Sequence, residues 1–272
     1  MRIGFFDSGI GGVSVAQSAM SNLPRYDYLY FADDTHMPYG NKDKESLYNL
    51  TTQALEKMFQ NDCKLVILAC NSASTILPQI QQEWLPRNYP DRKVLGVIRP
   101  TVEHMAESSD IRKIYVLATP VTVKSESFDH ELNKINIQCD FHEIACPGLA
   151  EAIELSADYT SDPKILTLIE KYLHTIPTDE IVEIYTGCTH YAFISPVVKQ
   201  LRPRAIVHNQ GTIVASKLKE YLNRHAEIES HLLKEIDTSR VTLCNSDSPG
   251  YILKLQKTFQ HSFDETVQTN TN

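Results

Sequence analysis

The stretch IGFFDSGIGGV, residues 3–13, joins a short apolar run to a glycine-rich loop and to the start of a helical pattern. Short apolar or β-branched runs recur along the chain and alternate with longer stretches of helical period. This alternation is typical of parallel sheets with crossover helices, because strands buried on both faces are almost entirely apolar. The sequence therefore predicts an α/β protein.

The expected secondary structure follows this alternation. Apolar runs predict strands at residues 2–6, 26–32, 64–69, 93–97, 113–118, 139–144, 180–186 and 204–207. Helical period is clear at residues 44–61, 125–135 and 163–174. After about residue 207 we expect helices that return to the first part of the chain, and we expect the polar tail, 264–272, to fray.

The two halves of the chain repeat one pattern. In each half a cysteine follows the third expected strand, Cys70 in the first half and Cys188 in the second. We therefore predict two similar parallel-sheet α/β domains that face each other across a cleft with pseudo-twofold symmetry. The first domain comprises residues 1–97 and 208–272, and the second comprises residues 98–207. Sites in such sheets form beyond the carboxyl ends of the strands, so the cleft is the expected site.

Composition narrows the classes of function. The chain of 272 residues has 26 Lys or Arg and 34 Asp or Glu, a formal net charge of −8 at pH 7. This charge argues against nucleic acid or an anionic membrane as an obligatory partner, since both select basic faces. A membrane-spanning helix needs about 18 or more apolar residues, and no such run occurs. The N-terminal apolar run is too short for a secretory signal, so we expect a cytoplasmic protein.

The opening loop resembles a phosphate-binding loop but fails the test of spacing. The dinucleotide pattern G-x-G-x-x-G, placed on Gly9 and Gly11, requires glycine at position 14, where Ser14 stands. We expect the glycines instead to let backbone N–H groups approach a small anion such as a carboxylate. Asp7 is either a helix N-cap or turn residue, or a group with chemistry of its own.

Cysteine usage points to single thiols. The six cysteines include no C-x-x-C pair, so we expect neither disulfides nor a metal site. Cys70 and Cys188 each end an apolar strand where a helix begins, and we expect the helix amides to lower the pKa of the thiol. A single such cysteine is usually a small buried hydrophobe, but two in matching surroundings favour catalytic roles. We assign to packing the remaining cysteines, Cys63, Cys139, Cys146 and Cys244.

The two thiols exclude some reactions and suit another. A protein tyrosine phosphatase needs Arg six residues after its cysteine, where Ile76 and Ile194 stand. A thiol protease has no use for a second cysteine. Two opposed thiols can remove a proton from one face of a tetrahedral carbon and deliver another to the opposite face, which inverts the centre.

Two further side chains accompany the thiols. Asp7 is placed to assist Cys70, and His190, two residues after Cys188, is placed to assist the second side. Taken alone, His190 is also compatible with a structural histidine.

With these residues in hand, the chain resembles the glutamate racemases of the aspartate/glutamate racemase superfamily from Gly4 to about Thr212. The resemblance rests on IGFFDSGIGG (3–12), YFADDTHMPYG (30–40), VILACNSAS (66–74), VLGVIRP (94–100), LATPVTVKS (117–125), ACPGLAEAIE (145–154) and YTGCTHYAF (185–193). It implies two α/β domains around a cleft, and interconversion of L- and D-glutamate without a cofactor, which supplies D-glutamate for peptidoglycan.

The resemblance also implies the site residues. The catalytic set is Cys70, Cys188, Asp7, His190 and Glu154. The substrate contacts it implies are Asp7, Ser8, Pro38, Tyr39, Gly40, Asn71, Ser72, Thr119, Thr122, Thr189 and His190. One departure reverses a charge near the expected hinge, because Arg99 stands where the family usually has Glu.

Other functions stay open at this point. The same mechanism suits aspartate, or several acidic amino acids. A decarboxylase with one active cysteine is disfavoured, because both cysteines are present. A non-catalytic ligand-binding or regulatory protein of the kind that inhibits DNA gyrase needs neither thiol. Among partners we expect a small-molecule substrate and a homodimer.

Overall fold

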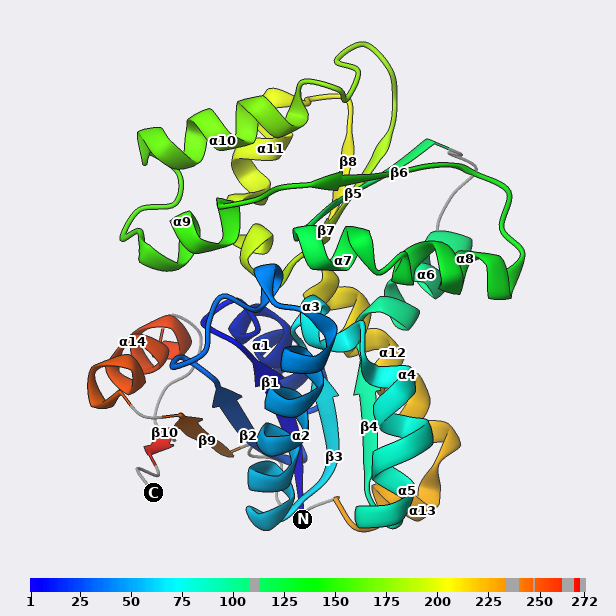
Figure 1. Cartoon of the computed structure of the whole chain (residues 1–272), viewed down its shortest axis with the longest axis vertical. Helices are drawn as coiled ribbons and strands as arrows, with labels where there is room; N and C mark the ends of the chain where they lie inside the picture. The colour runs from blue at the N-terminus through cyan, green and yellow to red at the C-terminus, as the bar shows by residue number, and fades with distance from the viewer. Residues whose placement is uncertain (108–112, 233–239, 247, 261–266, 270–272) are drawn as a thin grey trace.

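Two parallel sheets organise the computed structural model, one in each of its two lobes (Figure 1). The structure describes residues 1–107, 113–232, 240–246, 248–260 and 267–269. The first sheet has the order β10-β9-β2-β1-β3-β4, and the second has the order β6-β5-β7-β8. Every pairing in both sheets is parallel. The predicted class, two α/β domains with parallel sheets, is confirmed.

The strands have the following bounds. The first sheet contains β1 (Arg2–Asp7), β2 (Asp27–Ala32), β3 (Cys63–Leu68), β4 (Lys93–Gly96), β9 (Arg240–Asn245) and β10 (Val267–Thr269). The second contains β5 (Lys113–Ala118), β6 (Asp140–Ala145), β7 (Glu183–Gly187) and β8 (Ile206–His208). The four strands β2-β1-β3-β4 have the same sequential order as β6-β5-β7-β8. The two cysteines, which follow β3 and β7, therefore occupy equivalent places.

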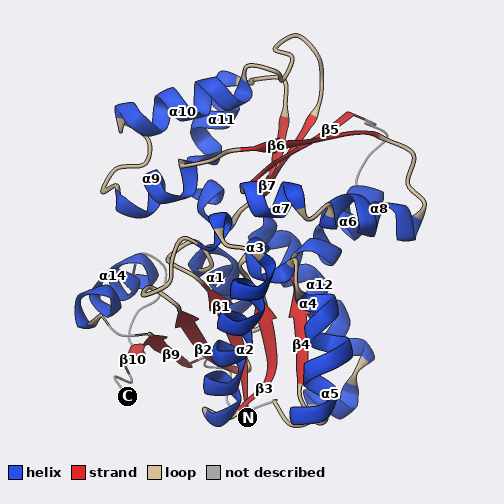
Figure 2. Ribbon diagram, in the orientation of Figure 1, coloured by secondary structure: helices blue, strands red, loops and turns tan. Residues whose placement is uncertain are grey.

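Helices flank both sheets (Figure 2). In the first lobe they are α1 (Val13–Asn22), α2 (Lys44–Gln60), α3 (Asn71–Ser74), α4 (Leu77–Gln79), α5 (Leu85–Asn88), α12 (Gln210–Arg224), α13 (Ala226–Glu229) and α14 (Pro249–Gln260). In the second they are α6 (Ile98–Glu107), α7 (Pro120–Lys124), α8 (Ser127–Ile135), α9 (Leu149–Leu155), α10 (Pro163–Leu173) and α11 (Ser195–Leu201). Short 3₁₀ or π segments are η1 (Tyr39–Asn41), η2 (Ile80–Trp84) and η3 (Thr189–Ile194).

The alternating direction of side chains along a strand explains the layered core. On β1, Phe5 packs into the cluster that contains residues of α1 and α12, whereas Phe6 packs into the cluster on the α2 side. Successive side chains of a strand point to opposite faces, so a strand covered on both faces is apolar throughout. N-cap residues mark where some helices begin. Asp43 accepts a hydrogen bond from Ser46 N at the start of α2, at 2.8 Å.

The C-terminal part of the chain corrects one expectation. Helices α12, α13 and α14 do return to the first lobe, as predicted for the residues after 207, but the prediction omitted β9, which pairs in parallel with β2. Strand β10 lies inside the tail expected to fray and pairs with β9, while residues 264–266 and 270–272 lie outside the described residues. The run RVTLCN, 240–245, is short and partly polar, and it becomes a strand because β2 offers it an edge. Such an edge is a tertiary feature that a local pattern does not contain.

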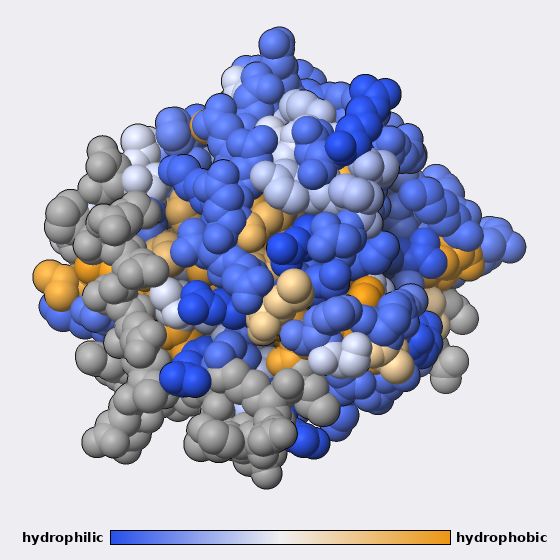
Figure 3. Space-filling model, turned by 90° about the horizontal axis from the view of Figure 1, so that it is seen from below, coloured by the Kyte–Doolittle hydropathy of each residue, from blue (hydrophilic) through white to orange (hydrophobic). Residues whose placement is uncertain are grey.

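The described surface is mostly polar. Seen from below, hydrophilic residues cover most of it, and apolar residues occupy small separate areas (Figure 3). The large hydrophobic side chains that are exposed within the described ranges are Met1, Leu155, Ile181, Ile206 and Leu253. Among the helices that the structure describes, none has both the length and the apolarity that crossing a bilayer requires.

Candidate active site

A cavity of about 210 Å³ lies between the lobes, where β3 and β7 end. The arrowheads of β2, β3 and β4 in the lower lobe point toward the upper lobe (Figure 2). Cys70 from the first lobe and Cys188 from the second both line this cavity. The fold therefore brings the two predicted thiols to one chamber, as expected for the carboxyl ends of facing parallel sheets.

Cys70 lies at the junction of β3 and α3 and is 6% exposed. Its Sγ lies 4.0 Å from Ser8 Oγ. Burial, and after it the charge of Asp7, raises the pKa of the Cys70 thiol and outweighs the hydrogen bond from the Ala73 amide, which lowers it. The helix amide lowers the pKa as predicted, but the expected net lowering is wrong for Cys70, because the cost of burying a thiolate exceeds the effect of one amide.

Cys188 lies beside His190, which pairs with Glu154. Its Sγ lies 4.0 Å from His190 Nδ1, and His190 Nε2 lies 2.6 Å from Glu154 Oε2. Burial lowers the pKa of His190, but its contacts with Cys188 and Glu154 raise it well above the ordinary value. Burial raises the pKa of Glu154, but His190 and Lys254 bring it down to about 2. The pair is therefore an imidazolium and a carboxylate at neutral pH.

Asp7 is the last residue of β1 and is fully buried behind the cavity. Its Oδ1 accepts a hydrogen bond from Gly9 N, and its Oδ2 accepts one from Thr189 Oγ1, each at 3.0 Å. Burial raises the pKa of Asp7 to about 6, although the charge of His190 and these hydrogen bonds oppose the rise. The N-cap alternative is wrong, since Gly12 occupies the N-cap of α1. Asp7 makes a turn contact and links the lobes through Thr189.

The glycines of the opening loop are explained by the close approach of the second lobe. A Cβ on Gly9 would lie 2.4 Å from Glu154 Oε2, and one on Gly11 would lie 2.4 Å from Thr189 Oγ1. The amide of Ile10 donates to Glu154 Oε2 at 3.1 Å. The expected anion at this loop is therefore a pair of the protein's own carboxylates, of Asp7 and Glu154.

We expect Gly11→Ala to lower kcat/KM at least about tenfold, because the new methyl group pushes Thr189 and His190 away from the loop, and small misplacements at a reacting centre are costly. Steady-state kinetics of racemisation measure the loss. Gly250→Ala is the matched control, since a Cβ there meets no atom within 4 Å. Equal activity of the two variants would contradict the steric argument.

Most predicted substrate contacts line the cavity. They are Ser8, Pro38, Tyr39, Gly40, Asn71, Ser72, Thr119, Thr189 and His190. Asp7 and Thr122 lie behind it. Thr122 Oγ1 lies 3.0 Å from Thr119 Oγ1, which lies 3.0 Å from Ser72 Oγ. This chain of hydroxyls crosses from the second lobe to the first, so Thr122 contacts Thr119, which lines the cavity, and not the cavity itself.

Two lining side chains are held by neighbours. Asn71 and Gln210 exchange hydrogen bonds through their amides, at 2.6 and 3.0 Å, and Gln210 also donates to Thr101 Oγ1 at 3.0 Å. The Tyr39 hydroxyl donates to Asp33 Oδ2 at 2.6 Å. Gln210 and Asp33 thus orient the cavity wall, and the sequence contains no local signal for either role.

Four of the described residues that line the cavity are not among the predicted site residues. The cavity also contacts Met37, Ala150, Glu151 and Leu155. Met37 precedes the predicted contact Pro38, and the other three belong to α9, beside Glu154. Their proximity to predicted site residues was the available signal. Within the described part of the chain, no three His, Cys, Asp or Glu side chains are grouped so as to hold a metal ion.

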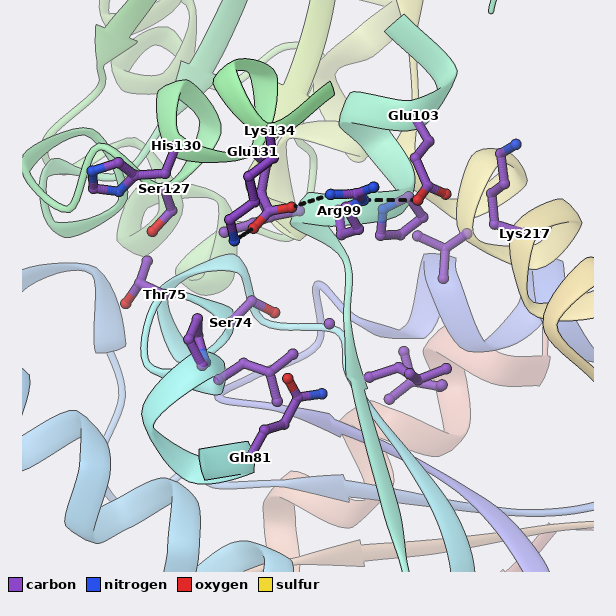
Figure 4. A pocket seen from close by; sticks show the side chains of 18 of the residues that line it. Ser74, Thr75, Gln81, Arg99, Glu103, Ser127, His130, Glu131, Lys134 and Lys217 are labelled. Atoms are coloured by element: carbon purple, nitrogen blue, oxygen red, sulfur yellow. Dashed lines mark hydrogen bonds and ion pairs between the residues drawn. The ribbon is translucent and has the colours of Figure 1, made fainter. Parts of the chain in front are cut away.

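The reversed charge at Arg99 is neutralised nearby. Arg99 lines a second cavity, of about 790 Å³, where it bonds Glu103 at 2.7 Å and Glu131 at 2.9 Å (Figure 4). Lys134 also bonds Glu131, at 2.5 Å. Arg99 therefore joins α6 to α8 within the second lobe.

Known proteins resemble this chain in both sequence and fold. The chain matches the family described as Asp/Glu/Hydantoin racemase over residues 14–215. The glutamate racemase of Paracoccus denitrificans is 34% identical over 240 residues, which are 84% of this chain and 87% of that protein. That of a Ruegeria strain is 36% identical over 240 residues, with the same two shares. The crystal structure of a glutamate racemase isoform from Bacillus anthracis has a TM-score of 0.84 at 24% identity, covering 99% of this chain and 96% of that one. Likeness that extends over most of both sequences shows that this chain belongs to the Asp/Glu/Hydantoin racemase family.

Proposed function

We propose that this protein interconverts L- and D-glutamate without a cofactor, by proton transfer between Cys70 and Cys188. The observation that carries the proposal is that the two thiols, one from each lobe, line a single cavity. Its volume of about 210 Å³ is below the roughly 300–1,000 Å³ of pockets for drug-sized ligands. It therefore suits a small amino acid better than a nucleotide.

The reaction balances with these two groups. The thiolate of one cysteine takes the α-proton, so an S–H bond forms while the C–H bond breaks and its electron pair stays on carbon. The thiol of the other cysteine then gives its proton to the opposite face, which forms the new C–H bond and leaves a thiolate. The reverse reaction exchanges the two roles. The raised pKa of Cys70 indicates that Cys70 begins as the proton donor.

The neighbouring charges assist both sides. His190, as an imidazolium whose Nδ1 lies 4.0 Å from Cys188 Sγ, is placed to exchange a proton with that sulfur. Asp7 is ionised above pH of about 6, and its charge acts on Cys70. Glu154 Oε2 lies 2.6 Å from His190 Nε2, the ring nitrogen that faces away from Cys188. Each thiol thus has an ionisable neighbour: Asp7 acts on Cys70, and His190 acts on Cys188.

Substrate recognition relies on hydroxyl groups. Among the described residues, the lining contains no lysine or arginine. Hydroxyls of Ser8 and Ser72 can donate to the two carboxylates of glutamate, whereas the Thr189 hydroxyl, which donates to Asp7, can only accept from the substrate. The carboxylate of Glu151, also in the lining, can face the substrate ammonium.

We expect the protein in D₂O to convert L-glutamate to D-glutamate with deuterium at the α-carbon, because the departing and arriving protons use different thiols. L-Aspartate, with one methylene less between its carboxylates, should turn over at least about tenfold more slowly, since one methylene is worth roughly 1–3 kcal/mol. Chiral chromatography and ¹H NMR measure both. Faster turnover of aspartate than of glutamate would make aspartate the assigned substrate. Inversion without uptake of deuterium at the α-carbon would contradict the two-thiol scheme.

We also propose the setting of this activity. The protein acts in the cytoplasm, where it supplies D-glutamate for peptidoglycan. The division into residues 1–97 with 208–272 and residues 98–207 is supported by the membership of β1–β4, β9 and β10 in one sheet and of β5–β8 in the other. The homodimer and the regulatory action on DNA gyrase stay predictions.

A further inference from the structure

The C-terminal helix α14 delivers two side chains to Glu154. Lys254 Nζ lies 2.6 Å from Glu154 Oε1 and also donates to the backbone carbonyl of Glu154. The Tyr251 hydroxyl donates to the same Oε1 at 2.9 Å. The other oxygen, Oε2, is bound by His190 Nε2 and by the amide of Ile10. Both oxygens of the carboxylate are therefore held.

These contacts join parts of the chain that are far apart in sequence. Helix α14 packs against β9 and α1 in the first lobe, while Glu154 lies on α9 in the second. In Figure 1, α14 lies at the side of the lower lobe on which α9 lies in the upper lobe. The end of the chain thus reaches across to the site.

The physical effect of this clamp passes through His190. A carboxylate that is 5% exposed is costly unless paired and hydrogen-bonded. Lys254, whose ammonium also lies 5.5 Å from the centre of the Tyr251 ring, supplies the second positive charge. A carboxylate fixed on both oxygens fixes the imidazole that it binds, because a hydrogen bond at one ring nitrogen sets the direction of the other. The other nitrogen, Nδ1, is the one that faces Cys188.

We propose that Lys254 and Tyr251 are positioning residues for racemisation, which hold Glu154 so that His190 faces Cys188. The proposal rests on the proposed function of the cavity. It assigns to the C-terminal helix a part in proton transfer, although neither side chain lines the cavity.

In the part of the chain that the structure describes, six ionisable groups interact electrostatically with Glu154. They are His190 on η3, Lys254 and Tyr251 on α14, Asp7 on β1, Tyr30 on β2 and Tyr159 after α9. Among these, Lys254 and His190 carry positive charge and lower the pKa of Glu154. Removal of Lys254 therefore raises the pKa of Glu154 from about 2 toward its ordinary 4.5.

The first test is kinetic. We expect Lys254→Met to lower kcat roughly 10- to 100-fold, as for a misplaced reacting group. Tyr251→Phe should lower it roughly 3- to 10-fold, as for the loss of one typical hydrogen bond. Lys254→Arg keeps the charge and should retain more activity than Lys254→Met. Lys257→Met, on the exposed side of the same helix, is the matched control and should match the wild type.

The second test needs no turnover. A carboxyl whose folded pKa is lowered stabilises the fold above its unfolded pKa, and this stabilisation is lost as the pH falls through the folded pKa. The urea midpoint of Lys254→Met should therefore lie below that of the wild type at neutral pH, and the gap should narrow as the pH falls from 4.5 toward 2. Lys257→Met should show no such narrowing.

The outcomes separate the two proposals. If the wild type racemises glutamate, any of three results would overturn the positioning role. These are an unchanged kcat in Lys254→Met, a change in KM alone, and equal losses of kcat in Lys254→Arg and Lys254→Met. A gap in urea midpoint that does not depend on pH would overturn the charge clamp itself. Absence of glutamate racemisation in the wild type would instead refute the proposed function, and the urea series still decides whether Lys254 keeps Glu154 ionised.

Discussion

Cys70→Ala and Cys188→Ala are each expected to lower the rate of glutamate racemisation roughly 10⁴-fold, the upper range for a positioned acid or base. In the proposed reaction each thiol serves one face of the α-carbon, so neither can replace the other. Both cysteines are 6% exposed, and the loss of one sulfur atom from such a position should cost only about 1 kcal/mol of stability. Chiral chromatography measures the rate, and circular dichroism checks the fold.

Cys146→Ala is the matched control for this pair. Cys146 is buried and close enough to Cys188 for their charges to interact, but its Sγ lies 3.4 Å from Ile144 O and does not line the cavity. We expect this variant to turn over at close to the wild-type rate. Near-normal racemisation by either Cys70→Ala or Cys188→Ala would refute the two-thiol scheme.

Asp7→Asn is expected to lower kcat roughly 10²-fold or more and, unusually, to stabilise the fold at neutral pH. The carboxylate of Asp7 is fully buried, and burial raises its pKa to about 6 from 3.8. An amide of the same shape can still accept from Gly9 N, and the hydroxyl of Thr189 can reverse its hydrogen bond. The variant loses the charge that acts on Cys70, but it also loses the cost of burying that charge.

The pH dependence of this stabilisation has a defined sign. Below pH 3.8 Asp7 is protonated in the folded and the unfolded chain, so the charge costs nothing. Between 3.8 and about 6 only the unfolded chain releases the proton, and the wild type loses stability as the pH rises. Above that range the cost is complete and amounts to about 1–3 kcal/mol.

Urea unfolding from pH 4 to pH 8 should therefore show an advantage of Asp7→Asn that grows up to about pH 6 and then levels off. A variant less stable than the wild type at pH 7, or a difference that does not change with pH, would contradict the buried-charge explanation. The result matters for function, because it would identify Asp7 as a group retained at the expense of stability.

The eight strands predicted from apolar runs all form, with bounds that differ by up to three residues. They were predictable because a strand covered on both faces needs an apolar side chain at nearly every position. The run at β9 contains Thr242 and Asn245 and sits beside polar segments, so its pattern was too weak to recognise. Its strand state depends on the edge of β2, which lies more than 200 residues earlier in the chain.

The site divides in the same way. Cys70 and Cys188 could be paired from sequence because each follows an equivalent strand, and the carboxyl ends of parallel strands gather at one edge. The pKa of Cys70 could not be inferred correctly, since helix amides are local but burial is produced by both lobes together. Lys254 and Gln210 carried no motif at all.

The sequence by itself determined the twin α/β units and the two thiols at matching strand ends, because these follow from local apolar patterns and from position along strands, while the hydroxyl groups around the thiols were implied by the resemblance to glutamate racemases. Only the tertiary structure decided which polar side chains the buried carboxylates meet: Glu154 meets Lys254, 100 residues away, and Asp7 meets Thr189, 182 residues away. The physical reason is that ionisation depends on burial and on neighbours within a few ångströms. Both are produced when the lobes pack, and neither is written in the order of the residues.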